Sequence, residues 1–307
     1  MVRIITCLLL VSNWSVPGWS QSLSPEMIRK VDAAATSEIR SQRLVGLGVG
    51  IIREGKVVFT RGYGLAVRET GTPFTSRTVT NWASNSKPVI AVVAMQLVES
   101  GKLKLEEKIR TYLPELPSHV GGVTVRQVLC HQSGYPHYNN GRIVKLVPAL
   151  QDAEEGDPLH SLNRFAGSPL LRKPGEVYSY SSYAYVILSA IVQRAGGKPL
   201  AELVRQGVTD RLEMNSFALD EKYDGQAEWS VGYRVGRDGE IARVRPYAHA
   251  WKHGAGGYKS SIEDFAKWAA AQTNKAICNG SAFRFQPPST HLVVTPRIDA
   301  GLQHTQN

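Results

Sequence analysis

The chain has 307 residues, of which 42% are hydrophobic and 20% are charged, and this composition excludes an intrinsically disordered polypeptide. The formal net charge of +10 favours acidic partners, but the basic residues are scattered and no nucleic-acid-binding motif accompanies them. We therefore expect a globular protein of one or two domains that does not bind nucleic acid.

Residues 1–20 are predicted to be a signal peptide. Arg3 precedes a short apolar stretch at 4–11, and Gly18 and Ser20 supply the small residues expected before a cleavage site. This stretch is too short to span a bilayer, and no later stretch is long and apolar enough to do so. The sequence thus predicts a secreted or periplasmic protein, cleaved near Ser20 and without a stable membrane span.

Residues 21–100 are predicted to begin an α/β domain. Ser24 can cap a helix over residues 24–42, and two β-rich runs around Glu54 and Gly55 predict an antiparallel hairpin. A turn-rich stretch then leads to an almost entirely apolar run at 88–98. That run predicts a helix that is buried on most sides.

Residues 101–225 are predicted to form a mainly helical domain. Thr124 is a candidate cap for a short helix that ends at Cys130, and residues 141–172 look partly helical and partly irregular. Further helices are expected over 182–195 and 200–212.

Residues 226–275 are predicted to return to the α/β domain. A second hairpin is expected around Asp238 and Gly239, followed by a helix with Asp264 near its first turn. Residues 276–307 form an irregular tail in this interpretation. Strands near both ends and helices between them predict an α+β fold, with an antiparallel sheet flanked by helices and a helical insertion domain.

Ser84 and Lys87 form a Ser-x-x-Lys pair at the start of the predicted buried helix. Residues three apart on a helix share one face, so the amine can reach the hydroxyl. Burial and the positive end of the helix both favour a neutral amine, which can act as the base for a serine nucleophile. Taken alone, the pair also fits a helix cap followed by a solvated lysine.

Tyr180 lies before another predicted helix, in the segment "PGEVYSYSSYAY". A tyrosine beside the Ser84–Lys87 pair could carry a proton to a leaving group. By itself Tyr180 fits equally well as one of several packing aromatic residues in this segment.

Metal and disulfide chemistry have weaker support in the sequence. His249 and His253 could bind a metal but lack a third ligand at suitable spacing, so we expect no metal and no cofactor. Cys130 and Cys278 could form a disulfide in an exported protein, but their spacing does not show that they meet.

Five segments resemble the serine β-lactamase and penicillin-binding-protein superfamily, in the branch of class C β-lactamases, D-Ala-D-Ala carboxypeptidases and esterases. They lie between about residues 44 and 270 and include "TNWASNSKPVIAVVAMQ", "VRQVLCHQSGYP", "PGEVYSYSSYAYVILSAIV" and "GAGGYKSSIEDFAKW". The resemblance implies that Ser84 is acylated, that Lys87 assists as base and that Tyr180 relays protons. It places His131 and Ser133 in a loop that helps to shape the site.

Two departures from the family pattern affect what we expect. Ser182 stands where the family has an asparagine after Tyr-x, so we expect Ser182 to bind substrate or Lys87 through a shorter polar side chain. The late Lys/His-Thr/Ser-Gly motif is not found, which implies an incomplete sheet and a chain that is either C-terminally truncated or divergent.

The resemblance implies an exported serine hydrolase that forms an acyl-enzyme with an amide, lactam or ester carbonyl. Its substrates would be β-lactams, D-amino-acid peptides or small esters. The alternative is a catalytically impaired binding module of the penicillin-binding-protein type, or a fragment without activity. Sequence alone does not choose between lactamase, peptidase and esterase, and it leaves the oligomeric state open.

Overall fold

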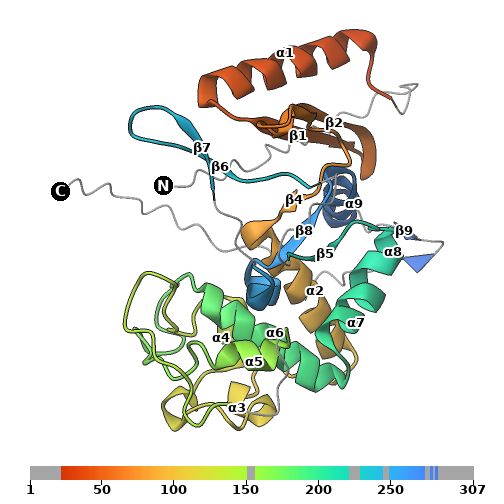
Figure 1. Cartoon of the computed structure of the whole chain (residues 1–307). Helices are drawn as coiled ribbons and strands as arrows, with labels where there is room; N and C mark the ends of the chain where they lie inside the picture. Colours follow the sequence, from red (N-terminus) through yellow and green to blue (C-terminus); the bar gives the residue numbers. More distant parts are fainter. Residues whose placement is uncertain are drawn as a thin grey trace. The chain divides into compact units, whose positions relative to one another are not determined.

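The computed structural model describes residues 22–150, 156–220, 229–244 and 249–273, and the backbone of 277–278 and 281–282 (Figure 1). The predicted signal peptide and nearly all of the predicted tail lie outside the described residues. The chain divides into two compact units. The sheet unit contains the described residues before Ser84, those of Arg205–Ala250 and those from Gly257 onward; the helical unit contains those of Ser84–Val204 and Trp251–Gly256.

The sheet unit combines short antiparallel sheets with a few helices. Its helical elements are α1 (Pro25–Gln42), the π-helical turn η3 (Arg205–Thr209), α8 (Asp210–Leu212) and α9 (Ile262–Thr273). Its strands are β1 (Gly46–Arg53), β2 (Lys56–Val67), β3 (Thr72–Pro73), β4 (Thr80–Asn81), β5 (Ala218–Leu219), β6 (Tyr233–Val235), β7 (Ile241–Arg243), β8 (Tyr258–Ser260), β9 (Ile277–Cys278) and β10 (Ser281–Ala282). They pair in the orders β1-β2-β3, β4-β8-β5, β6-β7 and β10-β9.

The β1–β2 hairpin has the turn that the sequence predicts. Glu54 and Gly55 have φ angles of 51° and 70°, as a two-residue turn between twisted strands requires. Helix α1 packs on one face of this hairpin, where Asp32 binds Arg61 and Tyr63 of β2. Helix α9 packs on the other face (Figure 1), where a Cβ at Gly48 or Gly50 would press against its side chains.

The helical unit is built around two apolar helices. Its elements are α2 (Ser86–Glu99), α3 (Ile109–Tyr112), η2 (Ser118–Val120), α4 (Val125–Leu129), α5 (Pro158–Leu162), α6 (Ser182–Gly196) and α7 (Leu200–Val204). The turn η1 (Ala83–Asn85) leads into α2, and most of the turn η4 (Ala250–Ala255) also belongs to this unit.

Helices α2 and α6 pack against each other, and α3, α4, α5 and α7 contact α6 (Figure 1). Almost every side chain of α6 from Ser182 to Val192 is buried, as are most of those of α2. Each apolar side chain that is fully buried contributes about 1.5–3 kcal/mol, so this helix pair is the core of the unit. It is also the element whose N-terminal ends carry the predicted site residues.

Most predicted elements are present, and one differs in an informative way. Residues 141–172, expected to be partly helical and partly irregular, contain the short helix α5 within their described parts, 141–150 and 156–172, where side chains such as Ser168 and Asn163 bind the backbone of neighbouring loop segments. The helix expected over 200–212 is interrupted by the π-helical turn η3, which contains Gly207.

The described residues thus contain both short antiparallel sheets and helices, as the predicted α+β fold class requires. Among the described residues, no helix has both the length and the apolar character that a bilayer crossing needs.

Candidate active site

The turn before α2 presents Ser84 to solvent. Ala83 in this turn has a left-handed backbone with φ 47°, and its N–H donates a hydrogen bond to Asn81 Oδ1 at 2.6 Å. A non-glycine residue adopts this conformation at a cost of about 1–2 kcal/mol, and such strain is concentrated at functional sites. The local structure therefore places an exposed serine at the entrance of a buried helix.

Lys87 lies in the first turn of α2, on the same side as Ser84. Its Nζ donates a hydrogen bond to Ser84 Oγ at 3.1 Å, as the Ser-x-x-Lys spacing predicts. The residue is only 4% exposed, and the first turn of α2, all of it described, contains no acidic residue. A protonated Lys87 amine is therefore poorly hydrated and has no carboxylate in this turn to balance its charge.

The pKa of Lys87 is lowered from 10.5 to about 7, mainly by burial and to a smaller extent by repulsion from the ammonium of Lys252. The Nζ also donates to the carbonyl oxygen of Ala255 and lies 4.9 Å from the ring centroid of Tyr180. Both contacts favour the ammonium form, but the loss of hydration outweighs them. A large fraction of the amine is therefore neutral near pH 7, which is the state that a general base requires.

Tyr180 completes a three-residue cluster. Its hydroxyl oxygen is 2.6 Å from Ser84 Oγ, within hydrogen-bond distance. The Ser84 hydroxyl is thus in contact with an amine on one side and a phenol on the other. All three residues belong to the helical unit, so the cluster is internal to one compact body.

Ser182 lies near the cluster, and its expected role in binding substrate stays a prediction. It is the first residue of α6 and is 2% exposed, and its backbone N–H donates to His137 Nδ1 at 3.2 Å. In the described part of the chain, the hydrogen bonds of Lys87 Nζ go to Ser84 and Ala255. No hydrogen bond within that part joins Ser182 to Lys87.

The loop 131–137 contacts the cluster through two histidines. The His131 ring lies 4.5 Å from the Tyr180 ring, and the His137 ring lies 5.4 Å from it, edge to face. The resemblance placed His131 in a loop near the site, but nothing in the sequence predicted a contact for His137. The aromatic-rich spacing of "HQSGYPHY" is the only signal that could have indicated it.

The segment 251–256 supplies the Ala255 carbonyl and Lys252, neither of which the sequence patterns predict. Gly254 allows this segment to approach the two central helices, because a Cβ there would overlap the side chain of Ile90. The Gly254 N–H also donates to Ser189 Oγ on α6 at 3.2 Å. The glycine-rich "HGAGG" run is therefore required for close packing.

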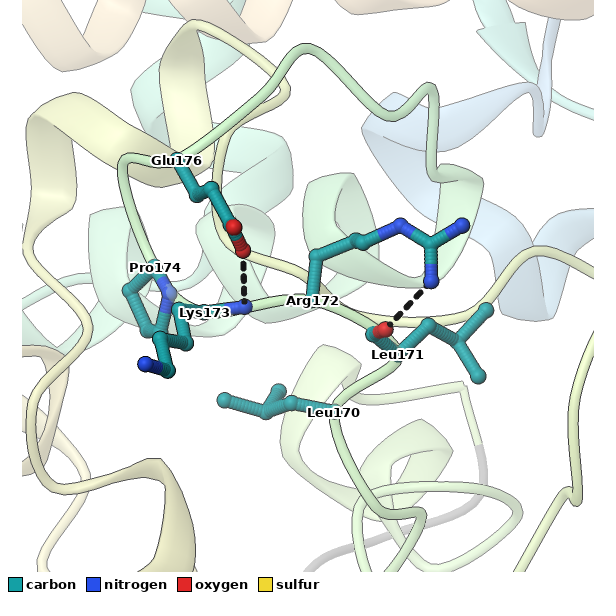
Figure 2. Close-up of a pocket in the computed structure, with 6 residues that line it drawn as sticks. All are labelled: Leu170, Leu171, Arg172, Lys173, Pro174 and Glu176. Atoms are coloured by element: carbon teal, nitrogen blue, oxygen red, sulfur yellow. Dashed lines mark hydrogen bonds between the residues drawn. The ribbon is translucent and has the colours of Figure 1, made fainter.

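An open depression of about 630 Å³ lies on the loop that precedes Tyr180 (Figure 2). It is lined by Leu170, Leu171, Arg172, Lys173, Pro174 and Glu176. Glu176 accepts a hydrogen bond from the Lys173 N–H, and Arg172 donates to the Leu171 carbonyl oxygen (Figure 2). None of the predicted site residues lines it, so we do not assign it to the cluster.

The remaining candidates have structural contacts. His253 is 1% exposed, and its Nε2 lies 3.3 Å from Ser161 Oγ. Among the described residues, no three His, Cys, Asp or Glu side chains lie together as a metal site would require. Cys130 is half-buried, and burial raises the pKa of its thiol; the side chain of Cys278 lies outside the described residues.

The sequence matches a model of a known protein family. The Beta-lactamase family model matches residues 27–294, which is most of the chain. This protein belongs to the Beta-lactamase family. The resemblance inferred from the five sequence segments is thereby confirmed.

Curated relatives of this Beta-lactamase family member include an esterase. Esterase EstB of Burkholderia gladioli is 33% identical over 195 residues, covering 60% of this chain and 50% of EstB. The human mitochondrial serine beta-lactamase-like protein LACTB is 25% identical over 289 residues, covering 74% of this chain and 53% of LACTB. The chain spans about half the length of the curated relatives it matches.

Solved structures share the fold. EstCE1, described as a hydrolase with promiscuous acyltransferase activity, superposes with a TM-score of 0.69 at 22% identity, over 86% of this chain and 75% of EstCE1. The octameric penicillin-binding protein homologue of Pyrococcus abyssi gives 0.65 at 22% identity, over 82% of this chain and 58% of the homologue. The fold of this chain is thus the β-lactamase and transpeptidase type.

Proposed function

We propose that this protein is a serine hydrolase that forms an acyl-enzyme at Ser84. One observation carries the proposal: Ser84 Oγ lies 3.1 Å from the Lys87 amine and 2.6 Å from the Tyr180 hydroxyl. A serine is a weak nucleophile until a nearby base removes its proton. The buried amine with a lowered pKa is suited to that role.

Acylation begins when neutral Lys87 accepts the Ser84 proton as Oγ attacks the substrate carbonyl. The N–H groups at the start of α2 have no intrahelical partners and favour the oxyanion that forms. As the tetrahedral intermediate collapses, the bond to the leaving group breaks and Tyr180 donates its phenolic proton to that group. The extra proton on Lys87 then restores the phenol, so no net charge remains in the acyl-enzyme.

Deacylation reverses these roles. Water attacks the acyl carbonyl, its proton passes to the Tyr180–Lys87 pair, and Ser84 leaves with a proton returned from that pair. Among the possible acyl donors, we propose small esters as the first substrates to test. Support comes from the 33% identity to an esterase and the fold shared with a hydrolase of promiscuous acyltransferase activity.

The deciding experiment is covalent labelling of Ser84. The protein is treated with a fluorophosphonate and analysed by intact mass and peptide mapping, and hydrolysis of p-nitrophenyl butyrate is followed in parallel. We expect one adduct on Ser84, and we expect Ser84→Ala to lose the adduct and to lower ester hydrolysis by about 10⁴-fold or more.

Ser118→Ala is a matched control for this experiment. Ser118 is also exposed in a 3-10 turn of the helical unit, and its substitution should leave labelling unchanged. A Ser84→Ala protein that still forms the adduct would contradict the nucleophile assignment. A folded wild-type protein that takes neither fluorophosphonate, a fluorescent penicillin nor any ester would support the alternative, a binding module without catalysis.

We also propose that the chain is exported. Support comes from the arrangement of Arg3, the apolar stretch at 4–11 and the small residues Gly18 and Ser20. Expression of the full chain in a Gram-negative host and intact-mass analysis of the periplasmic fraction should show loss of 20 residues. Retention of the whole N-terminus in the cytoplasmic fraction alone would contradict export.

A further inference from the structure

The loop 131–137 holds the residues on both sides of Tyr180. The Ser179 N–H donates to the His131 carbonyl oxygen at 2.7 Å, and the Ser181 N–H donates to His131 Nδ1 at 3.2 Å. The Ser181 hydroxyl donates to the carbonyl oxygen of Pro136 at 2.7 Å. The backbone that carries Tyr180 is therefore fixed immediately before and immediately after this residue.

The same loop contacts the Tyr180 ring itself. The His131 ring packs against it with a 36° tilt and is also 4.9 Å from the Tyr185 ring. The His137 ring meets Tyr180 at an interplanar angle of 71°. Two imidazole rings thus restrict both the plane and the tilt of the phenol that contacts Ser84.

Both imidazoles accept hydrogen bonds from the N-terminal end of α6. His131 Nδ1 accepts from the Ser181 N–H, and His137 Nδ1 accepts from the Ser182 N–H. A nitrogen that accepts a hydrogen bond carries no proton, so both rings are neutral with the proton on Nε2. Burial is the main factor that lowers the pKa of each ring, to about 4 for His131, and the Lys87 ammonium adds to it.

We propose that His131 and His137 are positioning residues that hold the Tyr180 hydroxyl in line with Ser84 through their neutral Nδ1 atoms. This inference rests on the proposed function, because it concerns the proton transfer that Tyr180 performs there. Neither histidine touches the Ser84 side chain in the described contacts, so each acts through Tyr180. The pair resembles a helix cap in which ring nitrogens replace the usual side-chain oxygens.

The leaving group of the substrate gives a test that a purely structural role would not satisfy. A p-nitrophenolate leaves without a proton, whereas an ethoxide requires one. If the histidines act through Tyr180, their loss should lower kcat/KM for ethyl butyrate far more than kcat/KM for p-nitrophenyl butyrate. The comparison uses kcat/KM because it reports acylation, whereas deacylation of the butyryl-enzyme is common to both esters. A general loss of folded protein would slow both esters equally.

The variants are chosen to separate the acceptor atom from the ring. His131→Asn and His137→Asn retain an oxygen near the Nδ1 position, and asparagine tolerates the left-handed backbone of His131, which has φ 56°. His131→Ala and His137→Leu remove the acceptor. We expect the Ala and Leu variants to lower kcat for ethyl butyrate by about 10²-fold, with KM within about threefold, and the Asn variants to recover most of that loss.

Tyr180→Phe is the reference variant for this series. It should show the same preference for p-nitrophenyl butyrate, and adding His131→Ala to it should cause little further loss in kcat because both changes remove one proton transfer. If the histidine variants lower kcat/KM equally for both esters, or if His131→Ala and Tyr180→Phe add independently, the positioning role is wrong while acylation of Ser84 stands. Absence of labelling at Ser84 in the wild type would instead overturn the proposed function.

Discussion

Helices α2 and α6 both begin at the Ser84 cluster, but their first turns are built in opposite ways. The start of α2 has no side-chain capping hydrogen bond and carries a cation, Lys87. The start of α6 is capped twice over: Ser181 Oγ accepts from the Ala184 N–H, and two histidines accept from the Ser181 and Ser182 N–H groups. One helix end lacks a side-chain cap, and the other has three side-chain acceptors.

This contrast indicates that the two helix ends have different roles, one in the reaction and one in positioning. A helix end without a cap and with a buried ammonium costs stability, and such costs are tolerated where they tune a reactive group. A helix end with side-chain caps gains stability, and its first residues are held in place. We infer that the turn η1 and the start of α2 supply the reactive pair Ser84–Lys87, while the start of α6 holds Tyr180 in a fixed position. Three substitutions test that division.

The largest effect is expected from Lys87→Met, which changes the reactive end. Ester hydrolysis should fall by about 10³-fold or more, because the base is gone. The melting temperature should rise at pH 7 and below, because the folded protein no longer buries an ammonium there, with a gain on the order of a few kcal/mol.

The size of this gain in stability depends on pH. The pKa of Lys87 is about 7 in the folded protein and has its ordinary value of 10.5 in the unfolded chain, so between these limits the unfolded chain binds the extra proton. Wild-type stability should therefore rise with pH across that window, and the advantage of Lys87→Met should shrink. Lys102→Met, at an exposed lysine just after α2, should change neither activity nor melting temperature; an equal rise in melting temperature there would refute the burial argument.

An intermediate effect is expected from Ser181→Ala, which weakens the supporting end. The substitution removes the cap of α6 and the hydrogen bond to the Pro136 carbonyl oxygen, so denaturant unfolding should show a loss of about 1–2 kcal/mol. Hydrolysis should fall severalfold at a temperature where the variant is fully folded. A loss of activity as large as that of Lys87→Met would show that the two helix ends are not distinct in role.

The smallest effect is expected from Lys252→Met. Its Nζ lies 5.1 Å from the Tyr138 ring centroid and 5.8 Å from that of Trp251, so the methionine can occupy the same aromatic surroundings. Removing its charge should raise the pKa of Lys87, since repulsion from Lys252 lowers it. The acidic limb of the pH profile of kcat/KM should move to higher pH, and activity near pH 9 should stay unchanged. A limb that does not move would contradict this electrostatic link.

Local patterns predicted the helix ends and turns well. Ser24 caps α1, Glu54 and Gly55 form the hairpin turn, and Thr124 makes a capping box with Gln127, because each depends on residues a few positions apart. The same is true of Ser84 and Lys87. The contact of Ser84 with Tyr180 was implied only by the family resemblance, since the two residues are 96 positions apart.

Contacts between distant segments could not be predicted. The Ala255 carbonyl oxygen is 168 positions from Lys87, and the partners of His137 lie 45 positions away, so no local period reveals either contact. Residues 141–172 were expected to be partly helical and partly irregular, but no local pattern indicated which part is which. In their described parts, side chains such as Asn163 and Ser168 bind loop backbone outside the short helix α5.

The close approach of Gly254 to α2 and α6 has a consequence for the order in which the protein folds. The carbonyl oxygen that contacts Lys87 arrives on a segment encoded far downstream of α2, and such long-range contacts form late because loop closure is slow. Until that segment docks, the amine is more hydrated, so its proton affinity stays closer to that of an ordinary lysine. In a nascent or partly folded chain, Lys87 would thus stay protonated and Ser84 would be unreactive. Ser84 would become a nucleophile only when folding is completed.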